Sequence, residues 1–383
     1  MIFEDDVKDN NLGIYLHIPF CIRKCNYCDF CSFPDPNEKL MSDYVDELTK
    51  RIERFSLCYG KRKVDTVYFG GGTPTLMSTE LFEKIIFALK NSFDISDSAE
   101  ITVECNPASI NGDGLLALRH IGINRLSIGL QSANNTELQL LGRLHSFEDF
   151  CNTFNEARNA GFDNISVDLM YGIPEQTAES FMYTLENLTA LAPEHISAYG
   201  LKIEEGTNFF KNVGKLDLPD EDAYAELYML CCEYLLKNGY QRYEISNFAK
   251  EGRESQHNLK YWLLDDYVGF GVAAHSCFEG ERFGNSRNIK AFLLGEDICC
   301  ERQKITHNEF VSEYVMLGLR LERGIDTKEF FEIAKHDFKQ LYPMTDSYIK
   351  NGFMTERDGK IAFTTKGYLV SNTILSQMLN FDD

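Results

Sequence analysis

The chain has 383 residues, of which 44% are apolar and 25% charged, and its formal net charge is -21. This composition excludes a disordered or collagen-like protein, and the lack of an 18-residue apolar run excludes a transmembrane helix. The acidic balance argues against nucleic acid or anionic lipid as a partner. The N-terminal segment MIFEDDVKDNN lacks the apolar stretch of a signal peptide, so we expect a cytoplasmic protein.

Strand-like and helix-like segments alternate through the first 200 residues. Apolar runs predict six strands, at 13–20, 64–70, 100–104, 124–130, 164–169 and 195–201. Helical patterns lie between and after them, near 38–57, 79–91, 112–121, 134–141, 147–160 and 177–191. Repeated βα units predict an α/β fold with a parallel sheet, either open or curled into a partial (βα)6 barrel.

The pattern changes after a long predicted helix near 219–238. Short mixed segments follow at 242–302, and a helix-rich region then carries two short β segments near 353–363 and a final helix near 366–379. The sequence therefore predicts three parts. They are an α/β core at 1–240, a mixed extension at 241–303, and a small helix-rich, winged-helix-like domain at 304–383.

Special residues follow the predicted strands at their carboxyl ends. They are Cys21, the glycines 70–72, Glu104, Gln131 and Asp168. A curled parallel sheet places its active site at the carboxyl ends of its strands, so we expect these features to meet at one rim. Taken alone, the glycines also fit a tight turn, and the carboxylates with Arg143 also fit a structural ion-pair network.

Twelve cysteines are many for a chain that we expect in a reducing compartment, and four of them fall within residues 21–31. Cys21, Cys25 and Cys28 form C-x3-C-x2-C, a spacing that can bind three irons of a [4Fe–4S] cluster and leave the fourth iron open. A zinc site or a cysteine-rich loop is the alternative. The other cysteines are expected to be small buried hydrophobes: Cys31, Cys58, Cys105, Cys151, Cys231, Cys232, Cys277, Cys299 and Cys300.

The cysteine motif and GGGTPT (70–75) resemble the radical S-adenosylmethionine (SAM) superfamily over most of the chain. The resemblance implies that the open iron chelates SAM and that cluster reduction cleaves its sulfonium C–S bond. The segments VECNP, NRLSIGLQS, LGRLHS and VDLMYGIP are similar to oxygen-independent coproporphyrinogen III oxidases and to the related HemW family of heme chaperones. The resemblance implies SAM-pocket roles for Tyr15, Tyr27, Gly71, Gly72, Thr73, Glu104, Gln131, Arg143 and Asp168.

Three features favour the chaperone branch. The oxidases carry a further cysteine where this chain has Phe30, and they have a longer stretch before the motif than the 20 residues that precede Cys21 here. The segment HNLKYW (257–262) matches a heme-binding motif of the chaperones, which implies His257 as a heme-contacting residue. Imidazole nitrogen can ligate heme iron, and Trp262, the only tryptophan, offers a flat apolar face.

The resemblance therefore implies a protein that binds a [4Fe–4S] cluster, SAM and heme, and passes heme to acceptor hemoproteins, with no residue assigned to catalysis. Radical decarboxylation of coproporphyrinogen III is the alternative, and a cluster scaffold without activity is the third. The sequence leaves open which hemoprotein accepts heme, which ligands bind its iron, whether SAM cleavage is needed, and whether the chain forms a homodimer.

Overall fold

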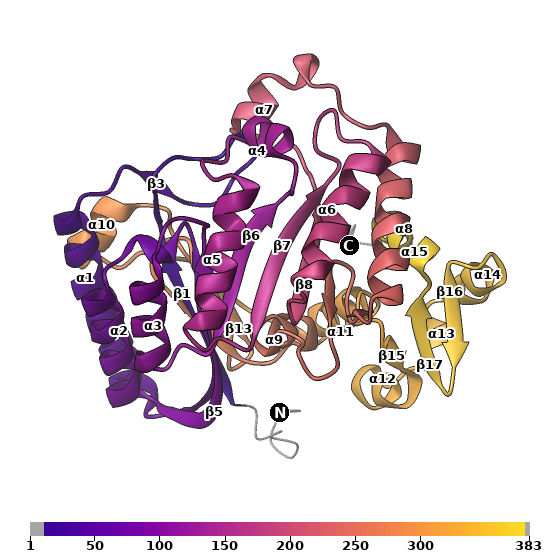
Figure 1. Cartoon of the computed structure of the whole chain (residues 1–383). Coiled ribbons are helices and arrows are strands. Elements are labelled where there is room, and N and C mark those ends of the chain that lie inside the picture. Colours follow the sequence, from indigo (N-terminus) through magenta and orange to yellow (C-terminus); the bar gives the residue numbers. More distant parts are fainter. Residues whose placement is uncertain (1–10, 380–383) are drawn as a thin grey trace.

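The computed structural model describes residues 11–379, and most of their strands belong to one twelve-stranded sheet (Figure 1). Its strand order is β14-β13-β12-β11-β1-β4-β5-β6-β7-β8-β10-β9. Six adjacent strands in the middle of this order run parallel. They are β1 (Leu12–Ile18), β4 (Lys63–Gly71), β5 (Asp94–Cys105), β6 (Arg125–Gln131), β7 (Ile165–Tyr171) and β8 (His195–Gly200). The predicted α/β fold with six parallel strands is confirmed, although β5 begins six residues earlier than expected.

Helices connect these strands and cover the outer face of the sheet (Figure 1). They are α1 (Glu38–Tyr59), α2 (Thr79–Ser92), α3 (Gly112–Ile121), α4 (Asn135–Leu141), α5 (Phe147–Asn159), α6 (Ala178–Ala190) and α8 (Glu221–Lys237). Local side chains define where several begin: Asn37 and Asn111 accept backbone N–H groups, and Ser146 and Thr177 form capping boxes. The helix boundaries agree with the sequence pattern to within about three residues.

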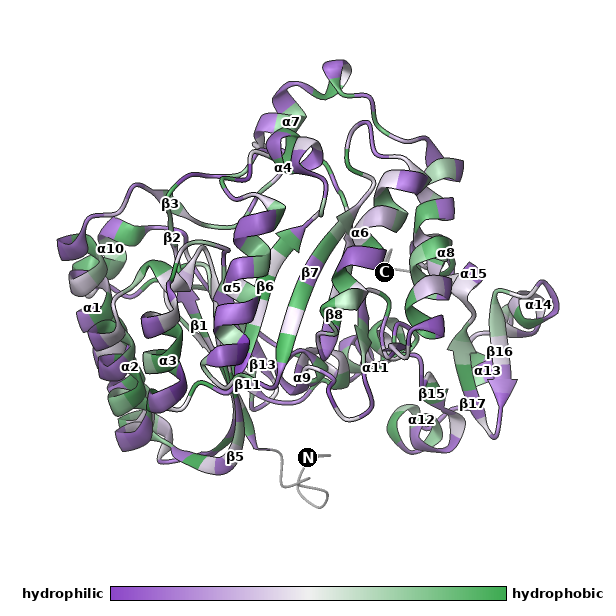
Figure 2. Cartoon of the chain, in the orientation of Figure 1, coloured by the Kyte–Doolittle hydropathy of each residue, from purple (hydrophilic) through white to green (hydrophobic). Residues whose placement is uncertain are grey.

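Each parallel strand presents apolar residues to the helices and polar residues to the inside of the barrel. In β7, Ile165, Val167 and Leu169 belong to the main apolar core, whereas Ser166 and Asp168 hydrogen-bond to side chains of the neighbouring strands β8 and β6 on the inner face, which surrounds the lumen of the barrel. Figure 2 shows this mixed hydropathy along the strands. Because side chains alternate with a period of two, the same strands supply the core on one face and a polar lumen on the other.

The segment after α8 extends the sheet at both edges. β9 (Gln241–Arg242) and β10 (Asn247–Ala249) join antiparallel beside β8. β11 (Tyr267–Phe270) pairs parallel with β1, and β12 (His275–Phe278), β13 (Glu281–Asn285) and β14 (Cys299–Lys304) follow in antiparallel order. The helices of this segment are α9 (Gln256–Leu263) and α10 (Ile289–Leu293).

The C-terminal region combines short helices with a three-stranded sheet of β15 (Ile325–Asp326), β16 (Met354–Arg357) and β17 (Lys360–Phe363). The strands β16 and β17 correspond to the two β segments predicted near 353–363, and β15 was not predicted. The helices are α11 (His307–Gly318), α12 (Thr327–Ala334), α13 (Phe338–Leu341), α14 (Thr345–Lys350), α15 (Thr365–Leu369) and α16 (Ser371–Leu379). The single final helix expected at 366–379 is wrong, since a break at Val370 divides it into α15 and α16.

Short elements lie in the loops between the longer ones. They are β2 (Phe20–Cys21), β3 (Phe33–Pro34), α7 (Asn208–Lys211) and the 3-10 turns η1 (Pro74–Leu76) and η2 (Val213–Lys215). Across residues 11–379, no helix has both the length and the apolar character needed to cross a bilayer. The N-terminal segment in which we find no signal peptide falls mostly in residues 1–10, outside the described part of the chain.

Candidate functional site

Three partly exposed cysteines of one loop mark the carboxyl end of the barrel. Cys21 ends β2, and Cys25 and Cys28 lie on the loop that leads to β3. All three are free thiols, and partial burial raises the pKa of Cys21 and raises that of Cys28 to about 11. Within residues 11–379, no three His, Cys, Asp or Glu side chains are arranged to hold a single metal ion. A cubane cluster does not require such convergence, because each cysteine binds a different iron.

Asn26 anchors this loop to two other segments of the chain. Its backbone N–H donates to Leu141 O over 3.0 Å, and its side-chain Nδ2 donates to Leu140 O over 2.8 Å. Its carbonyl oxygen accepts from Phe209 N over 2.9 Å, and its Oδ1 accepts from Asn208 Nδ2 over 2.9 Å. The loop between Cys25 and Cys28 is therefore held against α4 and α7 by four hydrogen bonds from one residue.

Two hydrogen-bond donors approach the cysteine sulfurs. Thr73 Oγ1 lies 3.7 Å from Cys21 Sγ, and Arg143 Nη1 lies 3.8 Å from Cys25 Sγ. A guanidinium beside a metal-bound sulfur can donate a charge-assisted hydrogen bond to it. The chemistry of this donor set fits a cluster with three thiolate ligands, and a small cavity beside Cys25, Thr73 and Arg143 gives the region access to solvent.

Asn106 connects these two donors and was not singled out from the sequence. Its Nδ2 donates to Thr73 Oγ1 over 2.7 Å, and its Oδ1 accepts from Arg143 Nη2 over 2.7 Å. Arg143 Nη2 also donates to Gly129 O over 2.7 Å, so its guanidinium is held in one orientation. The position of Asn106 two residues after Glu104, in VECNP, was the signal available in the sequence.

The glycine motif allows close backbone packing at the end of β4. Gly71 has a φ of 110°, which a residue with a side chain rarely adopts. A Cβ at Gly72 would lie 2.5 Å from Phe20 O, so any larger residue would displace the strand that leads into the cysteine loop. The glycines therefore allow this strand end to pack closely on the neighbouring backbone, and Gly71 N–H donates to Glu104 Oε2 over 3.0 Å.

Two carboxylates face the lumen below the cysteine loop. Glu104 accepts from Gly71 N and from the hydroxyl of Tyr68, the latter at 3.0 Å from Oε1. Asp168 accepts from Ser127 Oγ over 3.2 Å. Burial, followed by the charge of Asp168, raises the pKa of Glu104 to about 7, and burial also raises the pKa of Asp168. A cationic ligand would relieve this repulsion, which fits the amino and sulfonium groups of SAM.

The remaining residues predicted for the SAM pocket lie around the same space. Tyr15 faces the lumen from β1, and Gln131 ends β6 with a φ of 70° at an irregularity in the pairing with β7. Tyr27 packs against a separate apolar group made of Leu141, Met170, Ile173, Leu201 and Phe209. The structure thus brings the predicted pocket residues to one end of the barrel.

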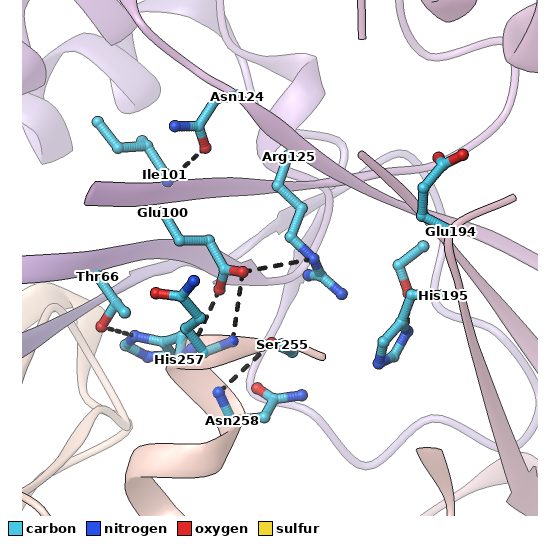
Figure 3. A network of polar contacts seen from close by, with 12 residues as sticks. Thr66, Glu100, Ile101, Asn124, Arg125, Glu194, His195, Ser255, His257 and Asn258 are labelled. Carbon is cyan, nitrogen blue, oxygen red and sulfur yellow. Dashed lines mark hydrogen bonds and ion pairs between the residues drawn. The ribbon is translucent and has the colours of Figure 1, made fainter. Parts of the chain in front are cut away.

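His257 lies nearer the amino ends of the parallel strands, beside Thr66 of β4 and Glu100 of β5 (Figure 3). It is fully buried in α9, and its ring nitrogens hydrogen-bond to Thr66 Oγ1 over 2.9 Å and to Tyr261 OH over 2.8 Å. Burial, and then the charges of Lys260 and Arg125, lower the pKa of His257 to about 3. Iron ligation by His257 would require one of these hydrogen bonds to break, because both ring nitrogens are occupied.

The remaining cysteines divide into buried and exposed groups. Cys31 is 8% exposed, and Cys105, Cys231, Cys232 and Cys277 are buried, as expected. Cys151 and Cys300 are partly exposed. The expectation is wrong for Cys58 and Cys299, which are exposed at the ends of α1 and β14, where helix and edge strand face solvent.

Comparisons with known proteins agree with this arrangement. The model of the Radical SAM superfamily matches residues 15–188, and the model of the HemN C-terminal domain matches residues 305–370. The chain is 33% identical to "Heme chaperone HemW" of Bacillus subtilis, over 95% of this chain and 98% of the relative. It is also 33% identical to "Heme chaperone HemW" of Escherichia coli, over 97% and 99%. Among solved structures, this chain superposes on coproporphyrinogen III oxidase (HemN) of Escherichia coli, described as a radical SAM enzyme, with a TM-score of 0.84. The two sequences are 25% identical, and the match covers 97% of this chain and 90% of that one.

Proposed function

Because the chain belongs to the heme chaperone HemW family of the radical SAM superfamily, we propose that it binds heme and delivers it to acceptor hemoproteins. The main support is likeness along nearly the whole chain to relatives that carry this name.

The proposal places a [4Fe–4S] cluster on Cys21, Cys25 and Cys28. The loop is held by Asn26, and donors from Thr73 and Arg143 face two of the sulfurs. A cluster held there would have one iron without a protein ligand, and it would supply electrons to SAM bound at that iron.

SAM is proposed to occupy the lumen between this loop and the two carboxylates. Glu104 and Asp168 would pair with its cationic and hydroxyl groups. Gly71, Gly72 and Thr73 lie at the end of β4 beside Glu104 and would line the same space. Arg143 would pair with its carboxylate. Tyr15, Tyr27 and Gln131 complete the surrounding wall.

Heme is proposed to bind near α9, which carries HNLKYW. Tyr261 and Trp262 are partly exposed and offer aromatic surface to a porphyrin. His257 remains the candidate axial ligand from the motif. For Nε2 of His257 to bind iron, its hydrogen bond to the hydroxyl of Tyr261 must first break.

Coproporphyrinogen III oxidation is the second candidate, because the fold closely follows HemN. The deciding experiment titrates the reconstituted protein with heme and then assays the same sample anaerobically for coproporphyrinogen turnover. The proposal expects saturable heme uptake near one per chain and no protoporphyrinogen IX. Multiple turnovers to protoporphyrinogen IX would overturn it and support the oxidase.

A further inference from the structure

Three stacked rings connect α9 with the upper part of the lumen. The imidazole of His257 stacks on the ring of Tyr68 with centroids 5.2 Å apart and planes 24° from parallel. Tyr68 also stacks on Tyr15 at 6.2 Å and 27°. These distances lie within the range in which aromatic rings attract each other beyond their burial. Tyr68 therefore has ring neighbours that restrict how its side chain can turn.

The far end of Tyr68 holds a residue of the proposed SAM pocket. Its hydroxyl donates to Glu104 Oε1 over 3.0 Å, while Gly71 N–H donates to Oε2 of the same carboxylate. A Cβ at Gly70 would lie 2.9 Å from Tyr68 Cε1, so this strand leaves room for the tyrosine ring. The orientation of the Glu104 carboxylate thus depends on where the Tyr68 ring lies.

Both ring nitrogens and the backbone N–H of His257 are hydrogen-bonded. Its ring is held by Thr66 and Tyr261, and its backbone N–H donates to Glu100 Oε1 over 3.1 Å. Figure 3 shows Thr66 and Glu100 reaching His257 from neighbouring strands, with His195 at a distance on the other side of Arg125. A ring with so many partners makes a rigid support for the ring stacked on it.

We propose that His257 is a positioning residue for Glu104, acting through Tyr68, so that α9 and the SAM pocket are energetically coupled. This inference rests on the proposed SAM site. It gives the HNLKYW helix a role in the heme-free protein, and any ligand that moves His257 would change the affinity for SAM.

The chain offers a matched control in His195. This histidine is also fully buried, and its ring nitrogens hydrogen-bond to Ser166 Oγ over 2.7 Å and Tyr243 OH over 2.8 Å. Its burial and its two ring hydrogen bonds match those of His257, but its ring contact is with Tyr243, whereas Tyr68 stacks on His257. A loss that reflects only a disturbed barrel would therefore appear in His195→Leu as strongly as in His257→Leu.

The test measures SAM affinity by calorimetry in the cluster-loaded protein. His257→Leu and Tyr68→Phe should each weaken binding roughly tenfold, as expected when a hydrogen bond to a charged group is lost, and His195→Leu should not. Adding His257→Leu to Tyr68→Phe should cause little further loss, because both act on one contact. Tyr261→Phe, which removes a single hydroxyl, is a milder variant for use if His257→Leu does not fold. This change should weaken SAM binding in the wild-type protein but not in the Tyr68→Phe protein.

Four results would separate the alternatives. Full additivity of the His257 and Tyr68 changes, or equal losses in the His195 control, would overturn the positioning role. If His257→Leu does not fold, unchanged affinity in Tyr261→Phe would do the same. Absence of SAM binding in the wild-type protein would instead overturn the proposed SAM site. In His257→Leu, the pH at which SAM binding is half-maximal should also shift upward. Burial and then the charge of Asp168 raise the pKa of Glu104, and the hydrogen bond from Tyr68 lowers it, so weakening that bond raises the pKa further.

Discussion

The hydroxyl of Tyr15 donates to Nδ1 of His17 over 3.0 Å. The direction follows from the other ring nitrogen, which lies 2.8 Å from the carbonyl oxygen of Cys31, a group that can only accept. Burial lowers the pKa of His17, so the ring is neutral and carries its one proton on Nε2. Tyr15 therefore uses its proton on His17 and presents only an oxygen acceptor to the lumen.

Tyr15→Phe should weaken SAM binding without loss of the cluster. The change removes an acceptor at the lumen, and leaving a buried ligand group without its hydrogen bond typically costs about 1–3 kcal/mol of binding free energy. Calorimetry on reconstituted protein measures the loss, and the iron–sulfur absorbance serves as the internal control. Wild-type affinity in this variant would remove Tyr15 from the pocket.

Alanine at Cys21, Cys25 or Cys28 should abolish the brown iron–sulfur absorbance, because each thiolate binds one iron. Cys31→Ala is the matched control on the same segment. Its side chain is packed in the core, so this variant should retain the cluster at some cost in stability. Equal cluster loss in the control would show that the ligand assignment is wrong.

SAM affinity should rise with pH up to about 7 and then level off. Burial and the neighbouring Asp168 raise the pKa of Glu104 to about 7, and only the ionised carboxylate attracts a cationic ligand. Below that pH the affinity should change by at most about tenfold per pH unit. Glu104→Gln should bind more weakly and lose this slope. A slope of the opposite sign in the wild type would contradict the assignment.

Glu104→Gln should stabilise the cluster-free protein at pH 8 relative to wild type. The folded pKa of about 7 lies above the unfolded value, so between the two the folded state binds more protons and stability falls as pH rises. The contribution is up to about 3 kcal/mol at pH 8 and vanishes below about pH 4. Denaturant unfolding at both pH values measures it, and an equal difference at both would exclude this cause.

Heme should quench the fluorescence of Trp262, the only tryptophan, if it binds at α9. His257→Ala should weaken heme binding or move the Soret band. An unchanged Soret band would exclude His257 as an axial ligand, since ligand exchange alters that band. The chaperone function would then be tested by heme uptake alone. Unquenched Trp262 at saturating heme would place the heme elsewhere.

The cysteine spacing and the six strands could be predicted because both are local. A thiolate motif on one loop depends on a few adjacent residues, and the period-two alternation of a strand such as β7 appears directly in its sequence. Asn106 and Tyr68 escaped notice because their importance comes from partners 37 and 36 residues away, Arg143 and Glu104.

The placement of α9 was decided by tertiary structure alone. In sequence, HNLKYW places Tyr261 four residues after His257, but nothing local indicates that Thr66 occupies the other ring nitrogen. The fold packs α9 beneath β4, where Thr66 and Tyr261 occupy both ring nitrogens and burial keeps the ring neutral. A sequence motif can thus specify which chemical group is present. Whether that group is free to bind a ligand depends on long-range contacts that form only in the folded chain.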